Sequence, residues 1–250
     1  MNHSLSRRQI QLWRIATYFI FALPGFAVAT WVSRTPNIRD ALGATTAEMG
    51  WIIFGLAVGS IFGLSSASHF IAHKGGRYVI LTGLVISSIG LIVIGIGSFW
   101  ITFSIVVFLG LAIFGFGNGI CNVAMNLEGT AVEKAVGKSL LTGFHAAFSL
   151  GTLLGAMLGA AAIKFGIIVP IHLMFVMMLI LVSVTYFYRL IPEGTGKEIG
   201  DDPVTGKEIG DDPVNPPMST QERMAIWRER RTILIGIVVL GMAFCGRFGK

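Results

Sequence analysis

Residues 78–98 read YVILTGLVISSIGLIVIGIGS, an apolar run without a charged residue. A helix rises about 1.5 Å per residue, so about 20 such residues cross the hydrocarbon layer of a bilayer, which is about 30 Å thick. Similar runs lie on both sides, and they predict six spans at residues 14–33, 49–71, 78–98, 100–123, 142–163 and 167–189. Backbone groups in lipid must be satisfied within a helix or a closed barrel, and the runs lack period-2 alternation. We therefore expect an all-α integral membrane protein with a six-helix bundle.

The composition agrees with this class and argues against others. Mean hydropathy is +0.75, only 13% of residues are charged, and residues 49–127 contain no Asp or Glu. The net charge of +6 comes from basic residues that flank the spans without forming a continuous patch, so we expect no nucleic-acid partner. No phosphate-binding loop, zinc-ligand spacing or nucleophile elbow occurs, and we expect neither an enzyme nor a cofactor or metal.

The distribution of Lys and Arg predicts the orientation. With the N-terminus in the cytoplasm, only Arg34, Arg39 and Lys164 lie outside. Fourteen basic residues then lie inside, namely Arg7, Arg8, Arg14, Lys74, Arg77, Lys134, Lys138, Arg189, Lys197, Lys207, Arg223, Arg228, Arg230 and Arg231. This positive-inside bias predicts a multi-pass protein of the inner membrane, in contact with the lipid bilayer, with a cytoplasmic N-terminus.

A polar stretch divides the chain after the sixth span. Residues 192–231 are rich in Gly, Pro and Asp, and the sequence TGKEIGDDPV occurs twice in succession, at 195–204 and 205–214. We interpret 1–191 as one six-helix domain and 192–231 as a cytoplasmic linker. Residues 232–250 resemble the start of a seventh helix whose apolar part is about 21 Å long, too short to cross. The expectation at this stage is a truncated fragment of a longer protein.

Two glycine ladders suggest an internal repeat. Span two contains Gly55, Gly59 and Gly63, and span five contains glycines in the same spacing, at 151, 155 and 159. Glycines four residues apart allow two helix backbones to approach closely in lipid. Their recurrence three spans later is what two inverted three-helix units would produce.

Four further stretches are distinctive: LPGFAVATWVSRTPNIRDAL, NVAMNLEGTAVE, FHAAFSLGTLLGA, and HFIAHKGGR at residues 69–77. With the six spans and the polar linker, they resemble the N-terminal half of a major facilitator superfamily transporter, and more narrowly its YbjJ-type inner-membrane branch. HFIAHKGGR is similar to the family's G-x-L-A-D-R-x-G-R motif. The resemblance implies a cytoplasmic gate built from His73, Lys74, Gly76, Arg77 and Glu128. His73 replaces the motif's acidic residue, which in the family helps to latch this gate. Arg77 or Lys138 could pair with Glu128 or Glu133.

The resemblance also implies a central cavity to which helices one, two, four and five contribute. Asn118, Asn122 and Asn126 share an arc of about 80° on the fourth span, and His145, Ser149 and Thr152 share a similar arc on the fifth. These polar arcs either line a transport pathway or hold the helices together. Trp31 and Arg34 end the first helix at the other end of the cavity, and we count them among the pathway candidates. Trp31 also suits an interfacial anchor, and Arg34 suits a gate or anion contact. Amides and hydroxyls suit a small polar solute, neutral or zwitterionic and possibly sugar-like.

Three functional hypotheses follow. The chain is a fragment of an alternating-access secondary transporter that is inactive without its second half, a non-transporting membrane interaction protein, or a six-helix transporter completed by another copy. Coupling to protons would use His145, the ionisable side chain of these two polar arcs, or a group in the second half, or be absent. His145 equally suits a structural hydrogen bond.

Overall fold

The computed structural model describes residues 6–194, and long helices dominate this range. Six are long and apolar enough to span a membrane: α1 (Arg7–Ser33), α3 (Thr46–Lys74), α4 (Gly76–Ile96) with its π-helical extension (Gly97–Ile101), α5 (Ser104–Val136), α6 (Leu141–Lys164) and α7 (Val169–Tyr188). No strand occurs among these described residues, so the predicted all-α membrane bundle is confirmed. The repeated decapeptide, most of the predicted linker and the predicted start of a seventh helix lie outside the described residues.

Local hydrogen bonds set where the first helices begin. Ser6 and Gln9 form a capping box at the start of α1, and Thr45 and Glu48 form another at the start of α3. A short helix that the sequence analysis did not predict, α2 (Thr35–Leu42), follows α1 directly. Hydropathy detects segments that cross lipid, so it misses a short amphipathic helix and the polar first turns of α1.

The helix α5 extends well past residue 123, where the predicted span ended. It continues to Val136 and stops at Gly137, whose φ of 70° places it in the left-handed region that glycine adopts without strain. The polar residues after 123 lowered the hydropathy without breaking the helix. As a consequence, Glu128 lies inside a helix and is buried, whereas the predicted fourth span ended before it.

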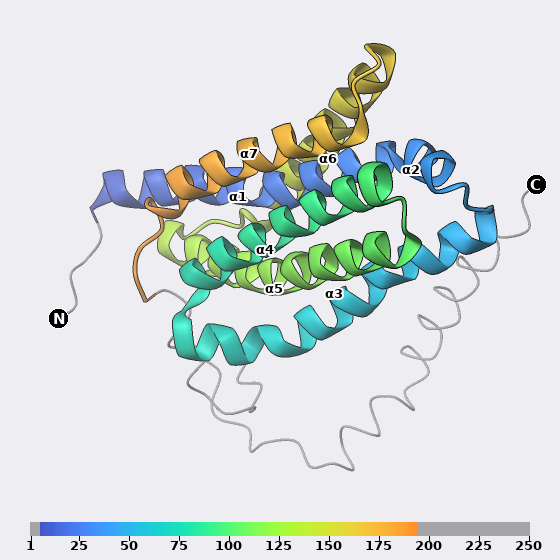
Figure 1. Ribbon diagram of the computed structural model, residues 1–250. Coiled ribbons are helices and arrows are strands. Elements are labelled where there is room, and N and C mark those ends of the chain that lie inside the picture. The colour runs from blue at the N-terminus through green and yellow to red at the C-terminus, as the bar shows by residue number, and fades with distance from the viewer. Residues whose placement is uncertain (1–5, 195–250) are drawn as a thin grey trace, which may run out of the picture. The chain divides into compact units, whose positions relative to one another are not determined.

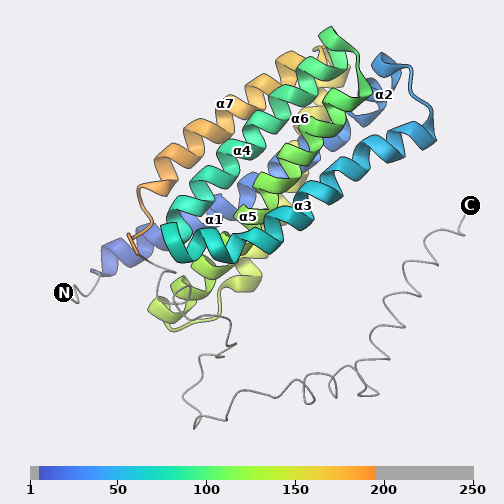
Figure 2. The ribbon, with the colours of Figure 1, turned by 60° about the horizontal axis from the view of Figure 1, so that its bottom comes forward.

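The helices pack in two equivalent pairs. Along its length α3 packs against α5, and α1 packs against α6, while α4 contacts both α5 and α7 (Figures 1 and 2). The first three-helix unit consists of α1, α3 and α4, and the second consists of α5, α6 and α7. Each pair then joins the first helix of one unit to the second helix of the other unit, α1 with α6 and α5 with α3. Equivalent helices of the two units run in opposite directions (Figure 1). This arrangement is the inverted repeat that the glycine spacing predicted.

The two glycine ladders form these two interfaces in the same register. Gly55, Gly59 and Gly63 of α3 face the carbonyls of α5 residues Phe108, Ala112 and Phe116. In the second pair, Gly151 and Gly155 of α6 face the carbonyls of α1 residues Ala22 and Phe26. A Cβ atom at any of these glycines would overlap the opposite backbone, which shows how closely the helices approach.

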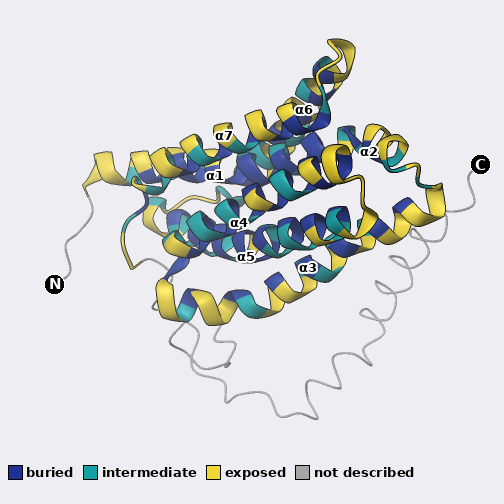
Figure 3. Ribbon diagram, in the orientation of Figure 1, coloured by how far each residue is buried: buried dark blue, intermediate teal, exposed yellow. Residues whose placement is uncertain are grey.

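Burial differs strongly between the spans. In α1 and α4 the most apolar windows are 61% and 56% buried, but in α3 and α6 only 28% and 22%. Figure 3 shows exposed residues along much of α3. Many exposed side chains are large and apolar, including Phe62, Leu153 and Val182. In a bilayer such surfaces face lipid tails or another set of helices.

Candidate transport site

The three asparagines of α5 lie along one side of the helix, at the edge of its contacts. Gly119, near this arc, packs against Ser60 of α3, and Gly129 faces Phe21 of α1 and Phe144 of α6. At about 100° per residue, Asn122 and Asn126 point between the directions of these two glycines. This part of the asparagine arc therefore has α3 on one flank and α1 and α6 on the other.

The asparagine side chains differ in exposure and bonding. Asn122 is exposed, whereas Asn118 and Asn126 are half-buried. The Asn126 amide donates to the Asn122 backbone carbonyl at 2.8 Å and to the Asn122 side-chain oxygen at 3.3 Å. The exposed Asn122 amide keeps donors and acceptors that water or a solute can reach.

On α6 the predicted polar arc separates into exposed residues and a packed one. His145 and Ser149 are exposed, and the Ser149 hydroxyl donates to the His145 carbonyl at 3.1 Å. His145 also contacts the Phe21 ring edge to face, with centroids 5.4 Å apart. Thr152 instead donates to the Phe148 carbonyl at 3.0 Å and lies against Gly25 of α1. The hydroxyl of Thr152 is thus part of the α1–α6 interface.

Trp31 and Arg34 are both buried at the end of α1. The Trp31 ring packs edge to face on Phe114, with centroids 6.3 Å apart. The Arg34 guanidinium donates to the carbonyl of Ile167, just before α7. Burial lowers the pKa of Arg34 below its usual value, although an arginine remains charged at physiological pH. The structure places both residues beside other helices of the bundle and not among the exposed polar residues of α5 and α6.

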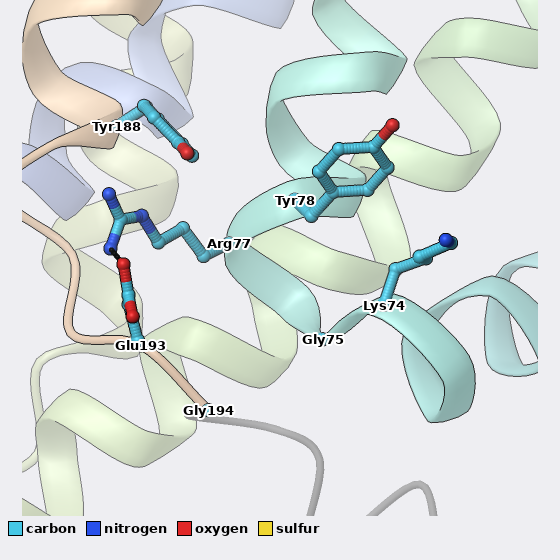
Figure 4. A pocket seen from close by; sticks show the side chains of 7 residues that line it. All are labelled: Lys74, Gly75, Arg77, Tyr78, Tyr188, Glu193 and Gly194. Atoms are coloured by element: carbon cyan, nitrogen blue, oxygen red, sulfur yellow. Dashed lines mark hydrogen bonds and ion pairs between the residues drawn. The ribbon is translucent and has the colours of Figure 1, made fainter.

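The motif between α3 and α4 surrounds a pocket of about 230 Å³ (Figure 4). Gly75 makes the turn with a φ of 83°, and Gly76 begins α4. The next residue, Arg77, points across the pocket toward the end of α7. Its guanidinium lies 4.2 Å from the centre of the Tyr188 ring and 3.1 Å from a carboxylate oxygen of Glu193. Arg77 therefore ties the start of α4 to the segment that follows α7.

The two histidines of the motif lie together on the last turns of α3. The His69 and His73 rings have centroids 4.3 Å apart, and His73 Nδ1 is 2.8 Å from the His69 carbonyl oxygen. Lys74 is exposed and points away from Arg77 (Figure 4). An imidazole at position 73 lacks the permanent negative charge of an aspartate, so it cannot serve as a carboxylate partner for a cation.

The two glutamates near the end of α5 have other partners than the expected ones. Glu128 accepts a hydrogen bond from the indole nitrogen of Trp13 at 3.2 Å. Glu133 accepts from the backbone amides of Leu140 and Leu141, at 2.5 and 2.8 Å, and so caps the start of α6. Among the described residues neither glutamate forms a direct ion pair with Arg77 or Lys138. Arg77 forms its ion pair with Glu193 and interacts with Glu128 only at longer range.

Comparison with known proteins identifies the family. A sequence model of the Major Facilitator Superfamily matches residues 14–248. The chain belongs to the major facilitator superfamily. It is therefore a multi-pass membrane protein of a transporter family, and this membership points to a transporter rather than an enzyme.

Three curated relatives match part of the chain. An uncharacterised MFS-type transporter of Yersinia pestis is 29% identical over 143 residues, which are 57% of this chain and 36% of the relative. An uncharacterised transporter of Sinorhizobium fredii, y4wD, is 28% identical over 66% of this chain and 43% of its own length. The membrane protein MosC of Rhizobium meliloti is 26% identical over 57% of this chain and 34% of its own length. The chain thus matches less than half the length of each relative.

Two contacts near the α3–α4 motif were not foreseen from the sequence. Trp13 is 115 positions from Glu128, and Glu193 is 116 from Arg77. Both partners were assigned other places, Trp13 just before the first predicted span and Glu193 in the linker. The inverted repeat could have indicated the contact between Trp13 and Glu128, because it brings the start of the first span close to the end of the fourth span, which is α5.

Proposed function

We propose that this protein is part of a secondary transporter that moves a small polar solute by alternating access. The observation that carries the proposal is the exposure of Asn122, His145 and Ser149 on helices that are otherwise apolar. Polar side chains facing lipid tails are costly, so exposed ones within spans usually face water or a partner. We assign the solute pathway to this face, together with the half-buried Asn118 and Asn126.

The chemistry of this face supports an uncharged or zwitterionic solute. Its asparagine amides and serine hydroxyl donate and accept hydrogen bonds, as recognition of a sugar-like molecule requires. His145 is the ionisable residue among the proposed pathway residues of α5 and α6, and it is our candidate for proton coupling. Its contact with Phe21 fits a structural role equally well.

The proposed pathway needs a second half. The low burial of α3 and α6 supports a further set of helices packing against them, since alternating access moves one repeat bundle against another around a shared site. We propose that a second six-helix bundle, from the same chain or from another copy, completes the cavity. The 250-residue chain alone would then transport no solute.

We further propose that the basic end of the bundle faces the cytoplasm of an inner membrane. The ends of α3 and α5 and the starts of α1 and α4 lie at one end (Figure 1), with Arg7, Lys74, Arg77 and Lys134. This distribution supports a cytoplasmic N-terminus through the positive-inside rule. The contacts of Arg77 then form a latch on the cytoplasmic side.

Thiol labelling tests the pathway assignment. In a protein whose two cysteines, Cys121 and Cys245, are replaced by alanine, Asn122→Cys should react with a water-soluble maleimide in native membranes. The matched control is Val182→Cys on α7, because Val182 is 65% exposed but lies in an apolar surface that we expect to face lipid. It should remain unmodified. Equal labelling of the two variants would contradict a water-filled pathway, and so would a complete lack of labelling at Asn122→Cys in every state tested. Either result would favour a non-transporting interaction protein.

A further inference from the structure

The far end of the bundle contains a group of buried polar atoms that the transport proposal does not use. Arg34, His172 and Trp31 are only 2%, 3% and 3% exposed. Arg34 Nε, Trp31 Nε1 and both ring nitrogens of His172 have no hydrogen-bond partner among the described residues. Buried polar atoms are rarely left unpaired, and each such atom calls for an explanation.

These residues belong to one region, at the end of α1 and the start of α7. Trp31 and Arg34 are three residues apart, and the Arg34 amide donates to the Trp31 carbonyl at 2.9 Å. The Arg34 guanidinium donates to the carbonyl of Ile167, and His172 lies in the first turn of α7 that follows. Arg34 and His172 are also close enough to interact electrostatically.

The charge of Arg34 has no protein counter-ion in the described part of the chain. Between residues 6 and 194 the ion pairs are Arg39 with Asp40 and Arg77 with Glu193. Asp40, the acidic residue nearest to Arg34 in the sequence, pairs with Arg39 at 2.8 Å. A buried cation without a paired anion is strongly unfavourable.

The start of α7 adds to the positive potential. No side chain caps this 20-residue helix, and no acidic residue lies in its first turn. The first amides of a helix have no partner within it, and the helix dipole places partial positive charge there. A guanidinium, an indole N–H and free helix amides all donate hydrogen bonds, and the ligand that satisfies them together is an anion.

We propose that Arg34, His172, Trp31 and the start of α7 form a buried binding site for a small monovalent anion of chloride size. The site lies where α1, α4 and α7 meet, since Gly95 of α4 packs against Pro170. The anion neutralises Arg34 and holds the ends of α1 and α7 together, so its role is structural and distinct from the solute pathway.

Thermal unfolding of the detergent-purified chain tests the site without any transport assay. The chain is compared in sodium chloride, bromide and gluconate at equal ionic strength, because gluconate is too large to enter. Chloride and bromide should raise the unfolding midpoint by about 3 °C or more, as expected for a ligand that binds only the folded state. Equilibrium dialysis with radiolabelled chloride should give one bound ion per chain.

Three variants separate the site from general salt effects. Arg34→Gln and His172→Leu should each abolish the difference between chloride and gluconate, and the second keeps the test valid if the first does not fold. Arg39→Gln is the control, because Arg39 lies at the same end but pairs with Asp40 at 2.8 Å; it should keep the full difference. Equal midpoints in chloride and gluconate, or an unchanged difference in both site variants, would overturn the proposal. So would full stabilisation by phosphatidylglycerol in the absence of chloride, since it would identify a headgroup as the ligand.

Discussion

The indole of Trp13 donates a hydrogen bond of 3.2 Å to the buried carboxylate of Glu128. Trp13 lies near the start of α1 and Glu128 near the end of α5, so the bond joins the first helices of the two inverted units. The Arg77 guanidinium is near enough to stabilise the carboxylate electrostatically. The buried acidic side chain of Glu128 therefore has partners on two other helices.

Replacing Trp13 by phenylalanine tests the strength of this bond. Trp13→Phe keeps an aromatic ring in the core but leaves the Glu128 carboxylate without its donor, and we expect a loss of about 1–3 kcal/mol in the free energy of unfolding. The loss can be measured by denaturant titration in detergent. The control is Trp51→Phe, because Trp51 is 72% exposed and should tolerate the change. Equal effects of the two substitutions would mean that the hydrogen bond contributes little.

The glycine ladder of α3 predicts a contrast within one helix. A Cβ atom at Gly59 would overlap the backbone of Ala112, whereas one at Gly50 would meet nothing within 4 Å. Gly59→Ala should therefore destabilise the protein by about 1–3 kcal/mol, as overpacking does. Gly50→Ala should be neutral or stabilise by up to about 1 kcal/mol, because alanine favours a helix. The same denaturant titration measures both, and a harmless Gly59→Ala would contradict the close approach of α3 and α5.

Features with a helical period were predictable from the sequence. The glycines at 55, 59 and 63 recur at every fourth position, and the structure confirms both the interface and its repetition in α6. The six spans were predictable because lipid requires long apolar runs.

Features that depend on tertiary contacts were not predictable in the same way. Hydropathy ended the fourth span before Glu128, and only packing against α1 shows that this carboxylate is buried. Trp31 and Arg34 are pathway candidates by sequence, and helical periodicity cannot tell which neighbouring helices they meet. The structure places them beside Phe114 and the start of α7.

The contacts of Arg77 predict which of its partners matters more. Glu193 is 88% exposed, so Glu193→Gln should cost less than about 1 kcal/mol. Tyr188→Leu removes an aromatic ring 4.2 Å from the guanidinium, and we expect a cost of about 1–2 kcal/mol. Tyr186→Leu is the control, because Tyr186 is 65% exposed and does not contact Arg77 among the interactions described. A larger effect of Glu193→Gln than of Tyr188→Leu on the unfolding midpoint would show that the ion pair dominates.

The proposed orientation predicts opposite labelling of the two ends of the bundle. Lys164 ends α6 at one end, and Glu193 follows α7 at the other; both are exposed. In the cysteine-free protein, Lys164→Cys should react with a membrane-impermeant maleimide in cells whose outer membrane alone is permeabilised. Glu193→Cys should react only after the inner membrane is opened. Both substitutions lie at helix ends and remove no core contact, so folding should be unaffected. The reverse pattern would overturn the cytoplasmic N-terminus, and it would also place the Arg77 latch on the outer side, because Arg77 and Glu193 lie at the same end.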